Sequence, residues 1–177
     1  RVERAAKLEH AETTFAAVAT ELLAKRAKEG LSPGTLVRER RLIEKDLARI
    51  GGLPVADVTA PALLAALRKI EQRGVIETAH RARGLAGQVF RYAIATGRAH
   101  GNPAADLAGA LESPRVRHFA SVTEPERVGE LLRTIRSYTG SPVTVAALNL
   151  APLVFVRPGE LRKAEWEEFD LDAAEWR

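Results

Sequence analysis

Apolar residues recur every three to four positions along the first hundred residues, which is the spacing of one face of an α-helix. With Ser/Thr caps before some apolar runs and glycines after them, the pattern predicts four helices over about 14–29, 33–50, 59–74 and 77–96. A short fifth helix is predicted from Asn102-Pro103 to Leu111. No strand pattern and no internal repeat interrupts these segments, so this region is expected to form a compact helical bundle.

The remaining residues combine more helices with a strand pattern. Thr123 to Glu126 should cap a helix that continues to Ile135, and Gly140-Ser141-Pro142 should begin another, Val143 to Phe155. The second of these is almost wholly apolar and is expected to be buried, with Pro152 kinking or breaking it. Phe169-Asp170-Leu171 and Trp176-Arg177 alternate as two short strands joined by a turn, a hairpin too short to be stable alone.

Two predicted helices carry polar stripes opposite their apolar faces. In segment 33–50, the expected inward residues are Leu36, Ile43, Leu47 and Ile50. Opposite them lie Arg38, Arg41 and Lys45, with Arg49 at the margin. In segment 77–96, the expected inward residues are Ala82, Ala86, Val89, Phe90 and Ala93. Its far side presents Arg81, Gly84, Gln88 and Arg91, flanked by His80 and Arg98.

Both stripes have an ordinary explanation, because charged residues on an exposed face are usually only solvated. However, neither stripe interleaves acids among its bases, and Gly84 and Gly87 are expected to remove bulk from the outer face. Each helical glycine costs about 1 kcal/mol relative to alanine, which close approach of a large partner or a tight helix crossing would explain. Arg and Gln side chains also bind phosphates and base edges. The pattern leaves both interpretations open and slightly favours DNA.

A separate motif surrounds Arg157. The apolar run from Leu150 to Val156 ends there, and Pro158-Gly159 begins a short predicted helix that reaches Trp166. The free N–H groups of a helix start suit a phosphate, and a guanidinium can bind two phosphate oxygens together. An ordinary i,i+3 salt bridge between Arg157 and Glu160 is the more frequent arrangement for these features alone.

Composition restricts the class of protein without deciding it. The 177 residues contain 27 Lys+Arg against 23 Asp+Glu, a mild basic excess whose position matters more than its size. The lack of cysteine excludes disulfides and thiolate metal sites, and fits a reducing cytoplasm. No membrane-length or signal-like segment is present. Methionine is absent even at position 1, so the chain is expected to be a piece of a longer protein.

The motif at Val156-Arg157-Pro158-Gly159-Glu160-Leu161-Arg162 resembles the first active-site motif of the tyrosine recombinases, and more narrowly of phage and genomic-island integrases. That family pattern is Arg-x-x-Glu-Leu, then Leu/Ala-x-Trp and an acidic strand, matched here by Ala164-Glu165-Trp166 and by residues 169–172. Residues 77–81, 90–98 and 102–104 are similar to the fourth-helix region of the core-binding domain. One departure is Val154-Phe155-Val156, where many members have Thr-Gly shortly before the arginine.

The resemblance implies a mainly α fold with four parts. A linker over 1–12 would precede a helical, SAM-like core-binding domain over 13–112. A basic interdomain linker over 113–118 would lead to the N-terminal part of a mixed α+β catalytic domain over 119–177, truncated at its first β-hairpin. The core-binding domain of the family clamps duplex DNA with its second and fourth helices, so the implied DNA-binding residues are Arg38, Arg41, Lys45, Arg81, Gly84, Gln88 and Arg91.

The resemblance also implies site-specific DNA recombination through a 3′-phosphotyrosyl intermediate, with Arg157 on the scissile phosphate and Glu160 supporting it. A covalent intermediate stores the bond energy, so neither a nucleotide nor a metal cofactor is expected. Lys163, Tyr92 and Tyr138 do not match the catalytic lysine or the nucleophilic tyrosine of the family. The chain by itself is therefore expected to be unable to cut DNA.

The implied partners are double-stranded DNA with att-type core sites and other integrase protomers on that DNA, with accessory DNA-bending proteins as a further candidate and no membrane. The implied location is the bacterial cytoplasm, at the nucleoid when DNA is bound. One alternative is a helical DNA-binding regulator that does not cleave, which calls for a recognition helix and a dimer surface; the sequence has no strong heptad or helix-turn-helix signature for it. Another is a helical protein-interaction module whose arginines only increase solubility.

Overall fold

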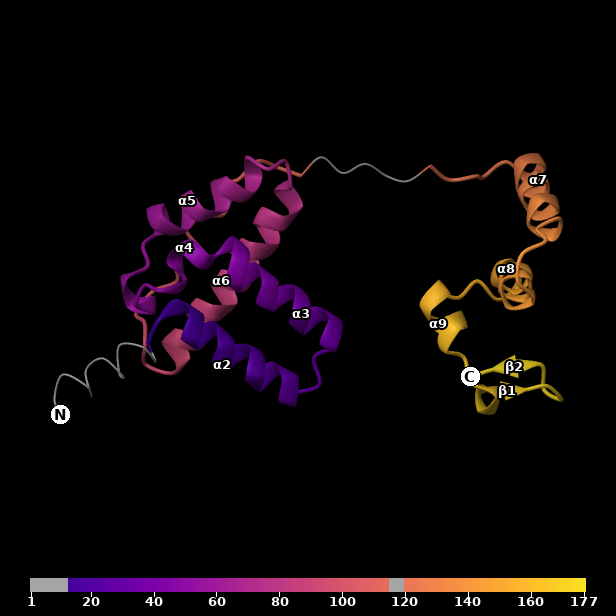
Figure 1. The fold of residues 1–177 in the computed structure, drawn as a ribbon, viewed down its shortest axis with the longest axis horizontal. Coiled ribbons are helices and arrows are strands. Elements are labelled where there is room, and N and C mark those ends of the chain that lie inside the picture. Colours follow the sequence, from indigo (N-terminus) through magenta and orange to yellow (C-terminus); the bar gives the residue numbers. More distant parts are fainter. Residues whose placement is uncertain (1–12, 115–119) are drawn as a thin grey trace. The chain divides into compact units, whose positions relative to one another are not determined.

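The computed structural model describes residues 13–114 and 120–177. The chain divides into two compact units, Arg1–Val116 and Arg117–Arg177 (Figure 1). The predicted linker over 1–12 and residues 115–118 of the predicted linker over 113–118 lie outside the described residues. None of the helices in the described ranges is both long and apolar enough to cross a bilayer.

The first unit is a helical bundle, as predicted. Its elements are α2 (Phe15–Lys28), α3 (Pro33–Arg41), the π-helical turn η1 (Leu42–Asp46), α4 (Ala48–Gly51), the 3₁₀ turn η2 (Val55–Asp57), α5 (Ala60–Glu71) and α6 (Ile76–Ala95). Helices α2 and α3 lie side by side as an antiparallel pair (Figure 1). Thr14, Ser32 and Thr59 accept the backbone N–H groups of Ala17, Thr35 and Ala62 at 3.3, 3.4 and 3.4 Å, which confirms the helix starts expected from these caps.

The second predicted helix is three pieces rather than one. Leu47 donates its N–H to the carbonyl of Leu42 at 2.8 Å, a five-residue bond that inserts one extra residue into the helix. Leu47 itself leaves helical geometry, with φ −102° and ψ 9°, and α4 follows. The predicted inward face survives this interruption, because Ile43, Leu47 and Ile50 are all buried.

The predicted fifth helix is wrong. Residues 103–109 form successive turns, with three-residue bonds such as Ala105 N–H to the Asn102 carbonyl at 3.0 Å. The Asn102 side chain accepts the Ala104 N–H at 3.2 Å and donates to the Gly87 carbonyl at 3.4 Å. The bond to Gly87 ties Asn102 to α6, and the backbone that follows closes three-residue bonds in place of the four-residue bonds of an α-helix.

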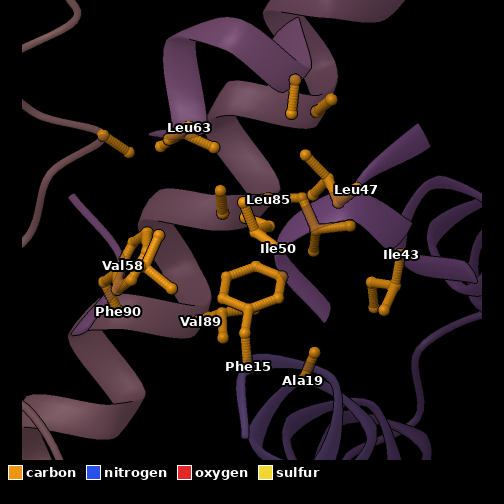
Figure 2. Packing of buried hydrophobic residues seen from close by; sticks show 14 of the residues in the cluster. Phe15, Ala19, Ile43, Leu47, Ile50, Val58, Leu63, Leu85, Val89 and Phe90 are labelled. Atoms are coloured by element: carbon orange, nitrogen blue, oxygen red, sulfur yellow. The ribbon is translucent and has the colours of Figure 1, made fainter. Parts of the chain in front are cut away.

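The core of the first unit collects around α6, which packs against α2, α5 and η1. All five residues predicted to face inward from α6 are buried, together with Ala79 and Leu85. The rings of Phe15 and Phe90 meet at a centroid distance of 5.4 Å with a tilted geometry. Figure 2 shows Phe15 pointing from α2 into this cluster, toward Ile50.

The second unit has α7 (Pro125–Arg136), α8 (Pro142–Val154), α9 (Pro158–Lys163), the 3₁₀ turn η3 (Trp166–Glu168) and the strands β1 (Phe169–Asp170) and β2 (Glu175–Trp176). The strands pair antiparallel, with Phe169 opposite Trp176, which confirms the predicted hairpin. Their rings stack at 4.9 Å, and the Trp176 indole N–H donates to Glu168 at 2.8 Å.

The expectation that the apolar helix here is buried is wrong. No residue of α8 is buried, and Val143 and Leu153 are each 81% exposed. The helix is apolar on all sides, and its main contacts within its unit are with α7 and α9, so much of its surface stays exposed. Pro152 lies in its last turn, and the helix ends at Val154 before Phe155 takes a left-handed φ of 53°. The predicted break ahead of Arg157 is therefore present.

The core predicts a large effect of removing Phe15. Phe15→Ala should lower the free energy of unfolding of the first unit by about 3–5 kcal/mol, because it leaves a cavity against Phe90. Val37→Ala, at a residue 66% exposed, should change it by no more than about 0.5 kcal/mol. Urea unfolding followed by circular dichroism measures both, and equal effects of the two substitutions would contradict the assigned core.

Candidate nucleic-acid interface

An open groove of about 930 Å³ runs between the α3–η1 segment and α6, and the turn between α5 and α6 completes its lining. The lining residues are Thr35, Arg38, Glu39, Arg41, Leu42, Lys45, Asp46, Arg73, Val75, Thr78, Arg81, Gly84, Leu85 and Gln88. The structure thus brings both predicted polar stripes to one concave surface, although they lie more than thirty residues apart in sequence.

Arg91 is the only predicted DNA-binding residue among these stripes that does not line the groove. It is exposed one turn beyond Gln88 on α6. A side chain at Gly87 would meet Arg91 at about 3.6 Å, so Arg91 lies toward the Gly87 side of the helix.

The acids of the groove are neutralised within the protein. Arg26 binds Glu39 at 2.6 Å, and Arg73 donates to the Asp46 carboxylate. Glu77 pairs with Arg81 at 3.3 Å on the exposed surface of α6. The sequence did not predict Glu39 and Asp46 as groove residues. The arginines that neutralise them lie on other elements of the fold, which the sequence does not bring together.

The three basic residues from α3 and η1 remain available. Arg38 donates to the Thr35 hydroxyl at 3.1 Å. Neither it nor Arg41 nor Lys45 forms an ion pair with any carboxylate in the described parts of the chain. A concave surface whose basic side chains have no acidic partner, and whose acidic side chains are neutralised, focuses a positive field that attracts polyanions.

The two glycines of α6 differ in what surrounds them. A side chain at Gly84 would meet nothing within 4 Å, so internal packing does not require glycine at this exposed groove position. Gly87 is buried, and its added carbon would lie 3.5 Å from Ala104. The expectation that both glycines remove bulk from the outer face therefore holds for Gly84 and is wrong for Gly87, which packs against the turns after α6.

The flanking residues His80 and Arg98 hold the bundle together instead of lining the groove. His80 Nε2 donates to the Glu112 carbonyl at 2.8 Å. Arg98 donates to Glu21 at 2.6 Å, and the hydroxyl of Tyr92 donates to the same carboxylate at 2.6 Å. The hydrogen bonds from Arg98 and then Tyr92 lower the pKa of Glu21, and the bond to Glu21 raises the pKa of Tyr92.

In the second unit, Arg157 is the N-cap residue of α9 and has extended backbone, with φ −66° and ψ 145°. Its backbone N–H donates to Glu160 at 2.8 Å, and its Nη1 donates to the same carboxylate at 3.1 Å. The backbone bond and then the guanidinium bond lower the pKa of Glu160. The Arg157 side chain is 87% exposed. The salt bridge expected as the ordinary alternative is confirmed, and the phosphate contact stays a prediction.

Residues 15–110 match the model of the phage integrase central domain. The chain belongs to the phage integrase family. The resemblance to tyrosine recombinases seen in the sequence is thereby confirmed, as is the mainly α fold class.

This family member is 34% identical over 146 residues to the integrase of Shigella phage Sf6, covering 82% of this chain and 38% of the relative. The same identity and coverage relate it to the prophage integrase IntS of Escherichia coli. The chain thus spans a little over a third of the length of these relatives.

Two solved structures share its fold. An NMR structure of a fragment of the phage integrase IntS of Escherichia coli is 38% identical, with a TM-score of 0.50 over 60% of this chain and 98% of that one. The Tn1549 transposon integrase in complex with circular intermediate DNA is 16% identical, with a TM-score of 0.71 over 90% of this chain and 52% of that one.

The Arg157–Glu160 contact predicts a specific titration. The pKa of Glu160 should lie below its ordinary value, and Arg157→Ala should raise it only part of the way, because the backbone N–H of residue 157 still donates. A lowered pKa stabilises the folded state above the ordinary pKa, and this stabilisation is lost as the pH falls through the lowered value.

NMR titration of the Glu160 carboxyl measures this pKa. Arg162→Ala, on the same short helix, is the matched control and should leave it unchanged. A Glu160 pKa at its ordinary value in the parent chain would contradict the described contact.

Proposed function

We propose that this chain is the DNA-binding portion, with the start of the catalytic domain, of an integrase that performs site-specific DNA recombination. The observation that carries the proposal is the groove between α3–η1 and α6. In it, basic side chains of α3 and η1 that have no acidic partner face polar residues of α6. The proposed division is a core-binding domain over 13–112, a basic linker over 113–118 and a catalytic portion over 119–177. The separation of the chain into two compact units near residue 116 supports it.

In the proposed complex, Arg38, Arg41, Lys45 and Arg81 contact phosphates of duplex DNA. Phosphate contacts fix the position of a protein on the duplex but carry no sequence information. Arg91, exposed beside the groove on α6, is proposed as a flanking phosphate contact. The Tn1549 integrase was solved in complex with DNA, which supports DNA as the partner of this fold.

Gln88 is proposed to read a base. A glutamine amide can donate to and accept from an adenine edge in the major groove. Gly84 lies one turn before it on the same face of α6 and leaves open space, so a base edge can approach the helix closely there.

Cleavage is proposed for the whole recombinase, and the chain by itself is proposed to be inactive. A tyrosine hydroxyl would attack the scissile phosphate and form a 3′-phosphotyrosyl link, while the bond from phosphorus to the 5′ oxygen breaks and that oxygen leaves as a 5′-hydroxyl. This exchange needs no metal or nucleotide cofactor. Arg157 would neutralise charge on the non-bridging oxygens. Glu160 would orient it, because the carboxylate already holds the backbone N–H and Nη1 of Arg157. Other protomers on the DNA and accessory DNA-bending proteins remain proposed partners.

The groove predicts different behaviour for Arg41 and Gln88. Arg41→Ala should reduce the slope of log K against log salt by about 0.9 on any duplex, because one phosphate contact is lost. Gln88→Ala should cost roughly 1–3 kcal/mol on a duplex selected for binding and less on random sequence. Fluorescence anisotropy at several salt concentrations measures both.

Matched controls lie next to the groove. Arg40→Ala removes an exposed arginine of α3 that does not line it, and Gln72→Ala removes an exposed glutamine at the end of α5. Unchanged affinities for Arg41→Ala and Gln88→Ala, or equal losses for their controls, would mean that these faces are only solvated.

Arg157 predicts a separation of binding from cleavage. In the full-length recombinase, Arg157→Ala should slow strand cleavage by roughly 10²–10³-fold, the effect of removing one preorganised oxyanion donor, while affinity for DNA stays nearly unchanged. Arg162→Ala, two residues past Glu160, serves as the control. A suicide substrate that traps the covalent intermediate measures cleavage. Cleavage at the parental rate by a folded, DNA-binding Arg157→Ala variant would mean that Arg157 is not the phosphate ligand and that its salt bridge to Glu160 is purely structural.

A further inference from the structure

Arg73 belongs to neither predicted stripe, yet it lines the groove. It lies in the turn between α5 and α6, where its N–H bonds the Ile70 carbonyl at 3.1 Å and Gly74 takes a left-handed φ of 78°. The groove therefore has a wall that belongs to no helix, and that wall carries a guanidinium.

The contact between Arg73 and Asp46 is unequal in its exposure. Arg73 Nη2 donates to Asp46 Oδ1, and the Asp46 side chain is 8% exposed whereas that of Arg73 is 55% exposed. A guanidinium has five N–H donors, and this contact uses one nitrogen. The nearly covered carboxylate thus holds one end of a guanidinium that remains largely open at the groove.

The other acid of the groove gives a useful contrast. Glu39 is bound by Arg26, which does not line the groove, and the two side chains are 15% and 22% exposed. That pair is covered on both sides and only neutralises charge. The Asp46–Arg73 pair differs because its basic member faces the groove.

We propose that Arg73 is a further phosphate ligand of the groove and that Asp46 is its positioning residue. The proposal rests on the proposed function, in which the groove binds duplex DNA. A planar guanidinium held at one edge presents its remaining donors in a fixed direction, so less conformational entropy is lost when a phosphate binds. The contact would be sequence-independent, and the turn between α5 and α6 would mark one edge of the DNA footprint.

Two other roles of Arg73 are possible outcomes of a test. It could be a structural tie that plays no part in binding, or a mask that only hides the Asp46 charge from DNA. The variants Arg73→Gln, Asp46→Asn and the double variant separate the three roles. Glutamine is chosen because its amide can still donate to Asp46, so the tie is kept while the charge is lost. Arg68→Ala is the control for net charge, because Arg68 is exposed on α5 but does not line the groove.

Binding of the chain to selected and random duplexes is measured at several salt concentrations, with thermal unfolding as the check on folding. For Arg73→Gln we expect roughly threefold to tenfold weaker binding on both duplexes, the effect of one lost hydrogen bond, and a salt slope smaller by about 0.9. Arg68→Ala should change neither. Asp46→Asn should weaken binding although it removes a negative charge, and the double variant should bind as weakly as Arg73→Gln.

Unchanged binding by Arg73→Gln would overturn the proposal in favour of a structural tie. Parental binding by the double variant, or tighter binding by Asp46→Asn, would overturn it in favour of a mask. Arg41→Ala distinguishes these failures from failure of the proposed function. If Arg41→Ala weakens binding and Arg73→Gln does not, only this inference fails; if neither weakens it, the groove is not the DNA site.

Discussion

The first unit depends on the burial of one face of α6. Seven of its twenty residues are buried apolar side chains, and four of these, Ala79, Ala82, Ala86 and Ala93, are alanines; the helix packs against α2, α5 and η1. Short side chains let the neighbouring elements approach closely, while Phe90 fills the centre against Phe15. Because the inward face is fixed, the opposite face has only one possible orientation, and it forms the groove with α3 and η1.

This constraint also sets the electrostatics of the groove. The same packing brings Arg26 to Glu39 and Arg73 to Asp46, so both acids are neutralised from outside the helix that carries them. Arg38, Arg41 and Lys45 are left without a carboxylate partner in the described part of the protein. A basic groove thus arises in a chain whose excess of basic residues is mild, 27 against 23.

The sequence could predict what depends on local periodicity and capping. The inward face of α6, the caps at Thr14, Ser32, Thr59 and Ser141, and the terminal hairpin all follow from short-range rules, and the structure has them. The two polar stripes could be found for the same reason, because each lies on one helix.

The predictions that were wrong concern features that depend on tertiary contacts. The spacing of Leu36, Ile43, Leu47 and Ile50 suits a straight helix, so nothing local revealed the π-helical turn. The predicted fifth helix is replaced by turns that follow Asn102, whose side chain bonds the Gly87 carbonyl fifteen residues away. The sequence did not predict Arg73 as a groove residue, because its partner Asp46 lies on another element. Burial of α8 was inferred from its composition, but burial requires neighbours that this unit does not place around it.

The groove between α3–η1 and α6 is proposed to be the DNA-binding surface. Amide correlation NMR spectra recorded during titration of the chain with duplex DNA test it most directly. Binding of DNA in the groove predicts that the largest chemical-shift changes fall on residues 35–46, 73–75 and 78–88, with small changes along α2 and residues 102–111. Changes that concentrate on α2 or on residues 102–111, or that spread evenly over the first unit, would contradict it.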